Sequence, residues 1–102
     1  MPRATPIRRE KVIDERGNIV ELVIWKVSPT ERNPSGIRYR LAFVLRGDTV
    51  PTVLYDYHPP KGHHRHVQQV EESYSFVNVE QLLADFTADV RRITGDATWP
   101  GR

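Results

Sequence analysis

Ile37-Arg-Tyr-Arg-Leu-Ala-Phe-Val-Leu-Arg46 is the most regular stretch of the chain, because its apolar and basic side chains alternate. Successive side chains of a β-strand point to opposite faces of a sheet, so the alternation predicts a strand with one apolar and one basic face. The apolar face would carry Ile37, Tyr39, Leu41, Phe43 and Leu45. The opposite face would carry Arg38, Arg40, Ala42, Val44 and Arg46. We therefore expect a half-buried strand whose arginines reach solvent.

The residues after this strand predict a hairpin. Gly47-Asp48 is typical of a two-residue turn, from which Thr49–Tyr57 would return antiparallel to the first strand. With so short a loop, two arginines and two tyrosines would share one sheet face: Arg38, Arg40, Tyr55 and Tyr57. Asp56 would then point to the opposite face.

Three more segments have the composition of strands. Ile7–Arg16 and Ile19–Val27 are joined by a Gly17-Asn18 turn, and the second is rich in β-branched residues. We expect Ile19–Val27 to lie inside the sheet, because both of its faces are largely apolar. Tyr74–Val77 is expected to be a short edge strand.

Asn78–Arg92 is expected to be a helix. Asn78 is a favoured N-cap residue, and Gly95 is a typical C-terminal stop. Apolar side chains recur at helical spacing: Leu82, Leu83, Phe86, Val90 and Ile93. We therefore predict an α+β fold, an antiparallel β-meander of four to five strands with one C-terminal helix packed on the face of Leu41, Phe43 and Leu45. Residues 7–95 would form a single domain, with tails at 1–6 and 96–102.

Composition narrows the class of protein. Of 102 residues, 38% are hydrophobic and 27% are charged, which fits a globular domain rather than a disordered chain. The lack of cysteine excludes disulfides and thiolate metal sites. With no apolar stretch long enough to span a membrane, we expect a cytoplasmic protein that does not bind membranes. The segments 32–46 and 58–69 are basic and 70–90 is acidic, so one surface patch could bind a polyanion such as nucleic acid, or the charges could simply be solvated.

All four histidines lie within Tyr55–His66, which reads Tyr-Asp-Tyr-His-Pro-Pro-Lys-Gly-His-His-Arg-His. Its two adjacent prolines remove two amide donors, so we expect a stiff loop after Tyr57 rather than a central strand. Histidine can act as acid or base near neutral pH, and Lys and Arg can stabilise a phosphate. The loop therefore favours metal-free RNA cleavage. The catalytic candidates are His64, His66, Lys61 and Arg65, and the RNA-binding candidates are Arg38, Arg40, Tyr55 and Tyr57.

Two other interpretations of the loop stay open. An extended backbone would place His64 and His66 on one face with Arg65 opposite. The histidines with Asp56 could instead ligate a metal, although Lys61 and Arg65 would oppose a divalent cation. The plainest interpretation is a solvated loop that caps the sheet, in which Asp56 accepts hydrogen bonds from the turn.

A wider set of residues resembles a known family. It runs from Glu10 to Arg92 and includes Glu21, Trp25, Tyr39-Arg40-Leu41, Tyr55-Asp56, Lys61-Gly62, His64-Arg65-His66, Tyr74, Phe76, Gln81–Phe86 and Asp89-Val90. This set resembles the TumE family of small prokaryotic toxins from toxin–antitoxin modules, whose central signature is usually Tyr-Asp-Asn-x-x-Gly-Lys-Gly-Asp-His-Arg-His. The chain departs from that signature at Tyr57, Pro60 and His63.

The resemblance implies the toxin of a type II toxin–antitoxin system, with a helix-turn-helix antitoxin as its partner. Together with the loop, it leads us to expect a metal-independent endoribonuclease of the RNA-interferase type that acts on RNA without a cofactor. Asp56 and Gly62 would orient the site. Two alternative functions remain, a non-catalytic protein that binds the antitoxin and a metal-binding protein. The chain could also form a homodimer.

Overall fold

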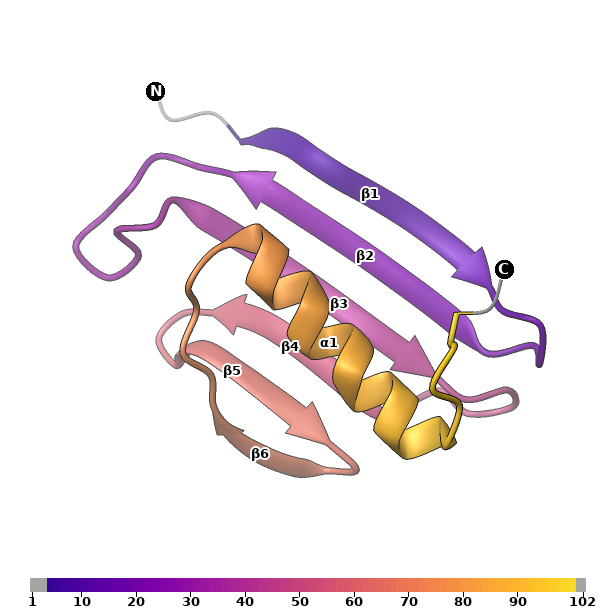
Figure 1. Ribbon diagram of the computed structural model, residues 1–102. Coiled ribbons are helices and arrows are strands. Elements are labelled where there is room, and N and C mark those ends of the chain that lie inside the picture. The colour runs from indigo at the N-terminus through magenta and orange to yellow at the C-terminus, as the bar shows by residue number, and fades with distance from the viewer. Residues whose placement is uncertain (1–3, 101–102) are drawn as a thin grey trace.

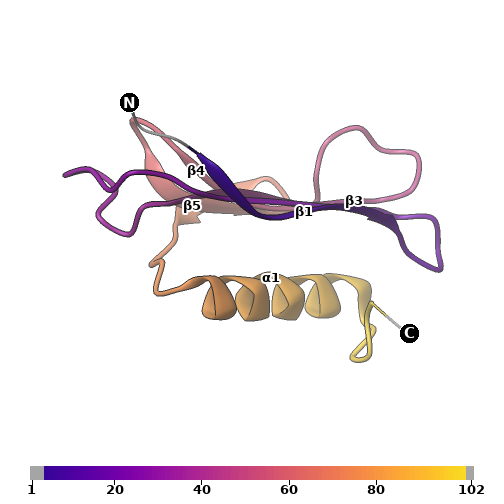
Figure 2. The ribbon, with the colours of Figure 1, turned by 90° about the horizontal axis from the view of Figure 1, so that it is seen from above.

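The computed structural model describes residues 4–100 and arranges them as one antiparallel sheet with a helix on one face (Figure 1). The strands lie in chain order: β1 (Thr5–Ile13), β2 (Ile19–Lys26), β3 (Ile37–Val44), β4 (Val53–His58), β5 (Gly62–Val67) and β6 (Val70–Ser73). Helix α1 (Val79–Thr94) follows them and leaves the other face of the sheet uncovered, as Figure 2 shows. The expected α+β meander with one C-terminal helix is confirmed, but with six strands rather than four or five. We call the uncovered side the open face and the other the helix face.

The additional strand, β5, comes from the histidine-rich stretch, which forms a hairpin with β4 and not a loop. Strand β4 runs through His58, the prolines occupy the turn, and β5 begins at Gly62, whose φ of 83° suits glycine. The edge strand is β6, at Val70–Ser73 and not at the expected 74–77. Gln68 and Gln69 both have positive φ, as the two-residue turn before β6 requires.

The predicted register between β3 and β4 is wrong by one residue. The chain does not return directly after Gly47-Asp48, and β4 begins only at Val53. Leu41 therefore pairs with Tyr55, and Arg40 pairs with Asp56. A shift of one residue moves every side chain of a strand to the other face. Tyr55 consequently lies on the helix face and Asp56 on the open face, the reverse of the expectation.

The core lies between α1 and the middle of the sheet. Leu41 and Phe43 are fully buried there, as expected, opposite a helix stripe that contains Leu82, Phe86 and Val90. Leu45 was expected in the same layer but lies beyond the end of β3 and is 36% exposed.

The expected caps of the helix are confirmed. The Asn78 side chain accepts a hydrogen bond of 2.7 Å from the Gln81 amide, which satisfies a donor that the first helical turn leaves free. Gly95 has φ 72° and its amide donates to the Arg91 carbonyl. The described part of the chain contains no helix that is both long and apolar enough to cross a membrane.

The C-terminal end of the described chain packs beside the β1–β2 turn. Trp99, inside the segment expected to be a tail, is buried and packs edge-on against Phe43 with ring centroids 5.5 Å apart. Its Nε1 donates to Asp14 Oδ2 at 3.0 Å. At the other end Thr5 and Pro6 belong to β1. The rest of the expected tails, residues 1–3 and 101–102, lies outside the described residues.

Candidate functional site

Strand β5 divides its basic residues between the two faces of the sheet. His64 and His66 point to the open face, and their ring centroids are 5.1 Å apart. His63 and Arg65 point to the helix face, as the alternation of the strand requires. The sequence therefore predicted the shared face of His64 and His66 correctly, although it placed them in a loop.

Asp56 lies beside His64 on the open face because the two residues are direct partners in the β4–β5 pairing. The distance from Asp56 Oδ1 to His64 Nε2 is 2.7 Å. The contact is close but not aligned as a hydrogen bond, so Oδ1 is buried without a hydrogen-bond partner among the described residues. His64 Nδ1 donates to the Gly62 carbonyl at 3.2 Å. Both nitrogens of this buried imidazole thus face an oxygen atom.

Lys61 reaches the same face from the β4–β5 turn, where its Nζ lies 2.9 Å from Glu71 Oε2. Glu71 comes from β6, directly opposite His66. The hydrogen bond from Lys61 lowers the pKa of the Glu71 carboxyl, and the nearby imidazoles of His66 and His64 lower it further. Glu71 could not be identified from the sequence, because only the pairing of β5 with β6 brings it to the histidines.

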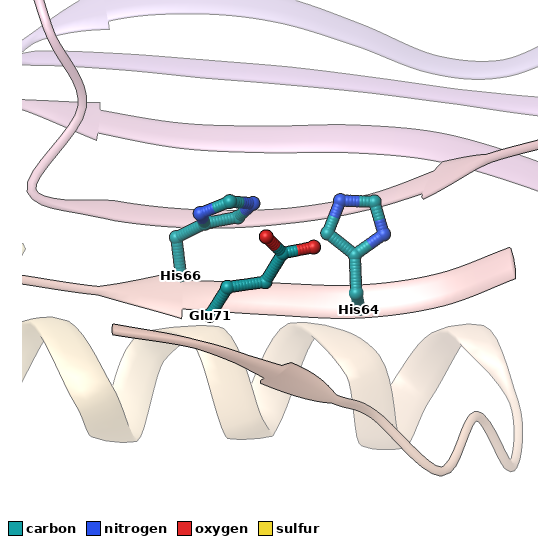
Figure 3. Close-up of side chains that lie close together, drawn as sticks. All are labelled: His64, His66 and Glu71. Carbon is teal, nitrogen blue, oxygen red and sulfur yellow. The ribbon is translucent and has the colours of Figure 1, made fainter. Parts of the chain in front are cut away.

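Three side chains of this group could hold a metal ion. The ligand atoms of His64, His66 and Glu71 all lie within 4.8 Å of one another (Figure 3). Figure 3 draws the Glu71 carboxylate between the two imidazole rings. Lys61 and Asp56 adjoin this triad, so the open face presents acids, bases and a cation together.

Arg65 does not belong to this group, although the sequence placed it among the catalytic candidates. Its guanidinium contacts Glu72 and donates to Tyr55 Oη at 3.1 Å and to Asp89 Oδ2 at 3.2 Å on the helix face. These partners raise the pKa of Arg65 above its ordinary value, first through the bond to Tyr55. The structure therefore gives Arg65 the surroundings of a residue that ties β5 to α1.

The expected cluster of two arginines and two tyrosines is not formed. Tyr55 is fully buried and donates to Asp89 Oδ2 at 2.5 Å, and burial followed by that bond raises its pKa. Tyr57 is also buried in the core. Only its contact with Arg38 resembles the expectation, with the Arg38 Cζ 5.9 Å from the ring centroid. Arg40 instead pairs with Glu21 on the open face at 3.3 Å.

A hollow of about 420 Å³ on the open face adjoins Asp56. Eight of its lining residues come from β2, β3 and β4: Val23, Trp25, Arg38, Tyr39, Arg40, Asp56, Tyr57 and His58. Trp25 was not among the expected site residues. Trp25 is the strand partner of Arg38, an expected RNA-binding residue, and therefore lies on the same face of the sheet. Aromatic and cationic side chains in one hollow are the combination that binds single-stranded nucleic acid.

His63 has an aromatic environment on the helix face. Its ring stacks on Phe76 with centroids 5.0 Å apart, and its Nδ1 lies 2.9 Å from Tyr39 Oη. Burial lowers the pKa of His63, so the neutral imidazole is favoured. The surroundings are those of a packing residue.

Comparison with known proteins identifies the family of the chain. The model of the family described as Toxin TumE matches residues 3–94, which is nearly the whole chain and includes the site. The chain belongs to the TumE toxin family. No curated protein matches the chain, and no solved structure matches it. Membership of a toxin family implies an antitoxin partner.

Proposed function

We propose that this TumE-family toxin cleaves RNA through the RNA's own 2′-hydroxyl, with His64 and His66 as its acid–base pair and without a metal ion. The observation that carries the proposal is the pair of imidazoles 5.1 Å apart on the open face, with Lys61 at its edge. Such cleavage needs one group that removes the 2′-hydroxyl proton and one that protonates the leaving 5′-oxygen. It yields a 2′,3′-cyclic phosphate and a 5′-hydroxyl.

The surroundings of the two imidazoles suggest their roles. His64 has an oxygen atom beside each ring nitrogen, Gly62 O beside Nδ1 and Asp56 Oδ1 beside Nε2, so an oxygen atom lies at each position that can carry a proton. We assign His64 as the acid that protonates the leaving oxygen. His66 is more exposed and serves as the base. Asp56 and Gly62 would position His64.

Lys61 would supply the electrostatic part of the reaction. Its ammonium is exposed and held by Glu71 alone among its described ion-pair partners, so it can turn toward a phosphate. Charge develops on the phosphate oxygens in the transition state, and a cation placed there lowers the barrier. Arg65 lies on the opposite face, where it would hold β5 against α1 and would not contact the phosphate.

The hollow beside Asp56 would hold the RNA strand. Trp25 offers a surface on which a base can stack, and Arg38 and Arg40 can contact phosphates. Tyr55 and Tyr57 are buried on the helix side and are not assigned RNA contacts. Single-stranded RNA is the substrate class that these groups favour.

We also propose that the antitoxin is a protein with a helix-turn-helix domain, as in a type II system. The support is family membership, which implies an antitoxin, and the resemblance described above. Co-expression of the toxin with the product of a neighbouring gene would test it. A complex that co-purifies and suppresses toxicity is expected. Suppression by an antisense RNA alone would contradict the type II assignment.

The experiment for catalysis uses purified, untagged protein and a fluorescent single-stranded RNA in excess EDTA. We expect cleavage that leaves a 2′,3′-cyclic phosphate and that His64→Gln abolishes. His63→Phe is the matched control, because His63 is the neighbour on the opposite face. Activity that EDTA abolishes and one divalent metal restores would overturn the metal-free mechanism. Toxicity without any cleavage would favour a non-catalytic binding protein.

A further inference from the structure

The β5–β6 hairpin brings two imidazoles and a carboxylate into one cluster. His66 and Glu71 are direct strand partners, and His64 lies two residues along on the same face. Their ligand atoms lie within 4.8 Å of one another (Figure 3). Two ligands of a zinc ion are about 4 Å apart at most, so small side-chain rotations would suffice to close the site. The chemistry is that of nitrogen and oxygen ligands on rigid strands.

We propose that His64, His66 and Glu71 bind one divalent transition metal ion of the zinc class, for which Glu71 exchanges its contact with Lys61. Imidazole and carboxylate are the ligand types that zinc accepts together. The expected consequence for activity rests on the proposed function, since ligated imidazoles cannot carry protons for RNA cleavage. The binding itself does not depend on that function.

The two partners of His64 are an independent observation in favour of the ion. A carbonyl oxygen can only accept, so Nδ1 carries the proton that it donates to Gly62 O. In the neutral ring, Nε2 then has a lone pair that faces Asp56 Oδ1 at 2.7 Å. That arrangement repels unless a cation or a proton joins the two atoms. Asp56 Oδ1, which is buried and has no hydrogen-bond partner within residues 4–100, would gain a partner when an ion binds Nε2.

The hydrogen bond at Nδ1 also matches a known feature of metal-binding histidines. Such a ligand usually donates its other ring N–H to a carbonyl or a carboxylate, which fixes the tautomer and the ring orientation. The Gly62 carbonyl provides this support for His64. The ring of His64, the most buried of the three ligands, is therefore already oriented for a metal ion, and the backbone need not change.

The charges that counted against a metal in the sequence are reduced in the structure. Arg65 lies on the helix face, where it is paired with Glu72 and Asp89. Lys61 remains on the open face, and its ammonium is paired with the Glu71 carboxylate that the metal would use. The ammonium is 57% exposed and can leave into solvent at little cost. Lys61 and the ion should thus compete for Glu71.

The test is a zinc titration of untagged, chelator-treated protein, followed by calorimetry and by competition with a chromophoric chelator. We expect one ion per chain. Glu71→Gln should weaken the affinity at least about tenfold, because even partners beyond the ligands change metal affinity by that factor. Glu72→Gln is the matched control, since Glu72 is the next residue on β6 and faces Arg65 instead. It should leave zinc affinity unchanged.

Two further variants sharpen the result. His66→Ala should weaken zinc binding as Glu71→Gln does. Lys61→Gln should raise the affinity, because it removes a positive charge beside the ion. No saturable binding, or equal loss in Glu71→Gln and Glu72→Gln, would overturn the site.

The same preparations separate this site from the proposed function. Zinc should inhibit RNA cleavage in proportion to its occupancy. Stoichiometric binding that needs Glu71, in a protein that cleaves no RNA, supports the site and rejects the proposed function. Cleavage without zinc binding rejects the site and leaves the proposed function in place.

Discussion

Strand β5 carries two pairs of basic side chains, one on each face of the sheet, and the two pairs have different surroundings. On the helix face, His63 lies among aromatic rings and Arg65 among carboxylates and a tyrosine hydroxyl. On the open face, His64 and His66 lie side by side, with Asp56 and Glu71 as neighbours. Adjacent residues with similar chemistry therefore have different surroundings, because successive side chains of a strand point to opposite faces of the sheet.

The difference teaches that a run of basic residues is not automatically one site. The helix-face pair has partners that fix it in the fold, and its change should cost stability. The open-face pair lies on the side of the sheet that the helix does not cover, and its change should cost function. Five variants, one of them a double substitution, test this division.

His66→Ala should give the largest effect, a complete loss of growth inhibition. The free energy of unfolding should change by less than about 1 kcal/mol, because His66 makes few contacts with the core. Induced growth curves and urea unfolding would measure the two quantities. His63→Phe is the control on the opposite face and should remain toxic. A toxic His66→Ala variant would remove His66 from the site.

Phe86→Ala tests the helix that covers the other face. Phe86 is 2% exposed and packs edge-on against Tyr55 with centroids 5.9 Å apart. Truncating such a residue should lower the free energy of unfolding by roughly 3–5 kcal/mol. Urea unfolding of the purified variant gives this value. A loss below about 1 kcal/mol would mean that the helix contributes little to the core.

Arg65→Met separates a structural arginine from a catalytic one. Without Arg65, the Asp89 carboxylate keeps its bonds to Tyr55 and to the exposed Arg92. A buried polar group that loses a partner costs about 1–3 kcal/mol, so stability should fall by that amount. RNA cleavage per folded molecule should persist. Abolished cleavage in a variant of normal stability would instead return Arg65 to the catalytic group.

Arg38→Gln with Arg40→Gln tests the basic part of the open face. Phosphate contacts release counterions from RNA, so the double variant should bind all RNA sequences more weakly. The slope of log affinity against log salt should decrease by about 0.7 for each phosphate that the variant no longer binds. Fluorescence anisotropy at several salt concentrations measures it. An unchanged slope would place RNA elsewhere on the molecule.

His63 should give the smallest effect, seen only as a pH dependence of stability. Its pKa in the fold lies below the ordinary 6.5, because burial disfavours the charged ring. The unfolded chain therefore binds more protons below pH 6.5. The contribution of His63 is complete above that pH and is lost as the pH falls through the lowered pKa. Unfolding of His63→Phe from pH 7.5 to 5 should show a flatter dependence than the parent. Identical slopes would contradict the buried, neutral His63.

Much of the fold could be predicted from local signals. The alternation of Ile37–Arg46, the cap at Asn78 and the stop at Gly95 all indicate the elements that formed. What could not be predicted was the β3–β4 register. Asp48 does form a turn with Leu45, but the chain continues as a loop before it rejoins the sheet at Val53. No local signal fixes the length of such a loop.

That one-residue error accounts for most of the errors at the site. It exchanged Tyr55 for Asp56 on the open face and so removed the carboxylate from the histidines. Glu71 was missed for a different reason. It reaches the site only because Gln68 and Gln69 adopt a turn that favours Gly or Asn, so the sequence contained no turn signal there. His64 and His66 were found because their relation depends only on strand alternation.

The order of the elements also bears on how the chain folds during synthesis. Every strand pairs with its neighbour in the sequence, so each hairpin can form as soon as it leaves the ribosome. The helix that covers the apolar face is made after all six strands. A nascent sheet therefore keeps Leu41, Phe43 and Tyr55 uncovered until α1 emerges. Until α1 is made, this apolar surface is accessible to chaperones. The strands that form the open face are complete before the helix can stabilise the sheet.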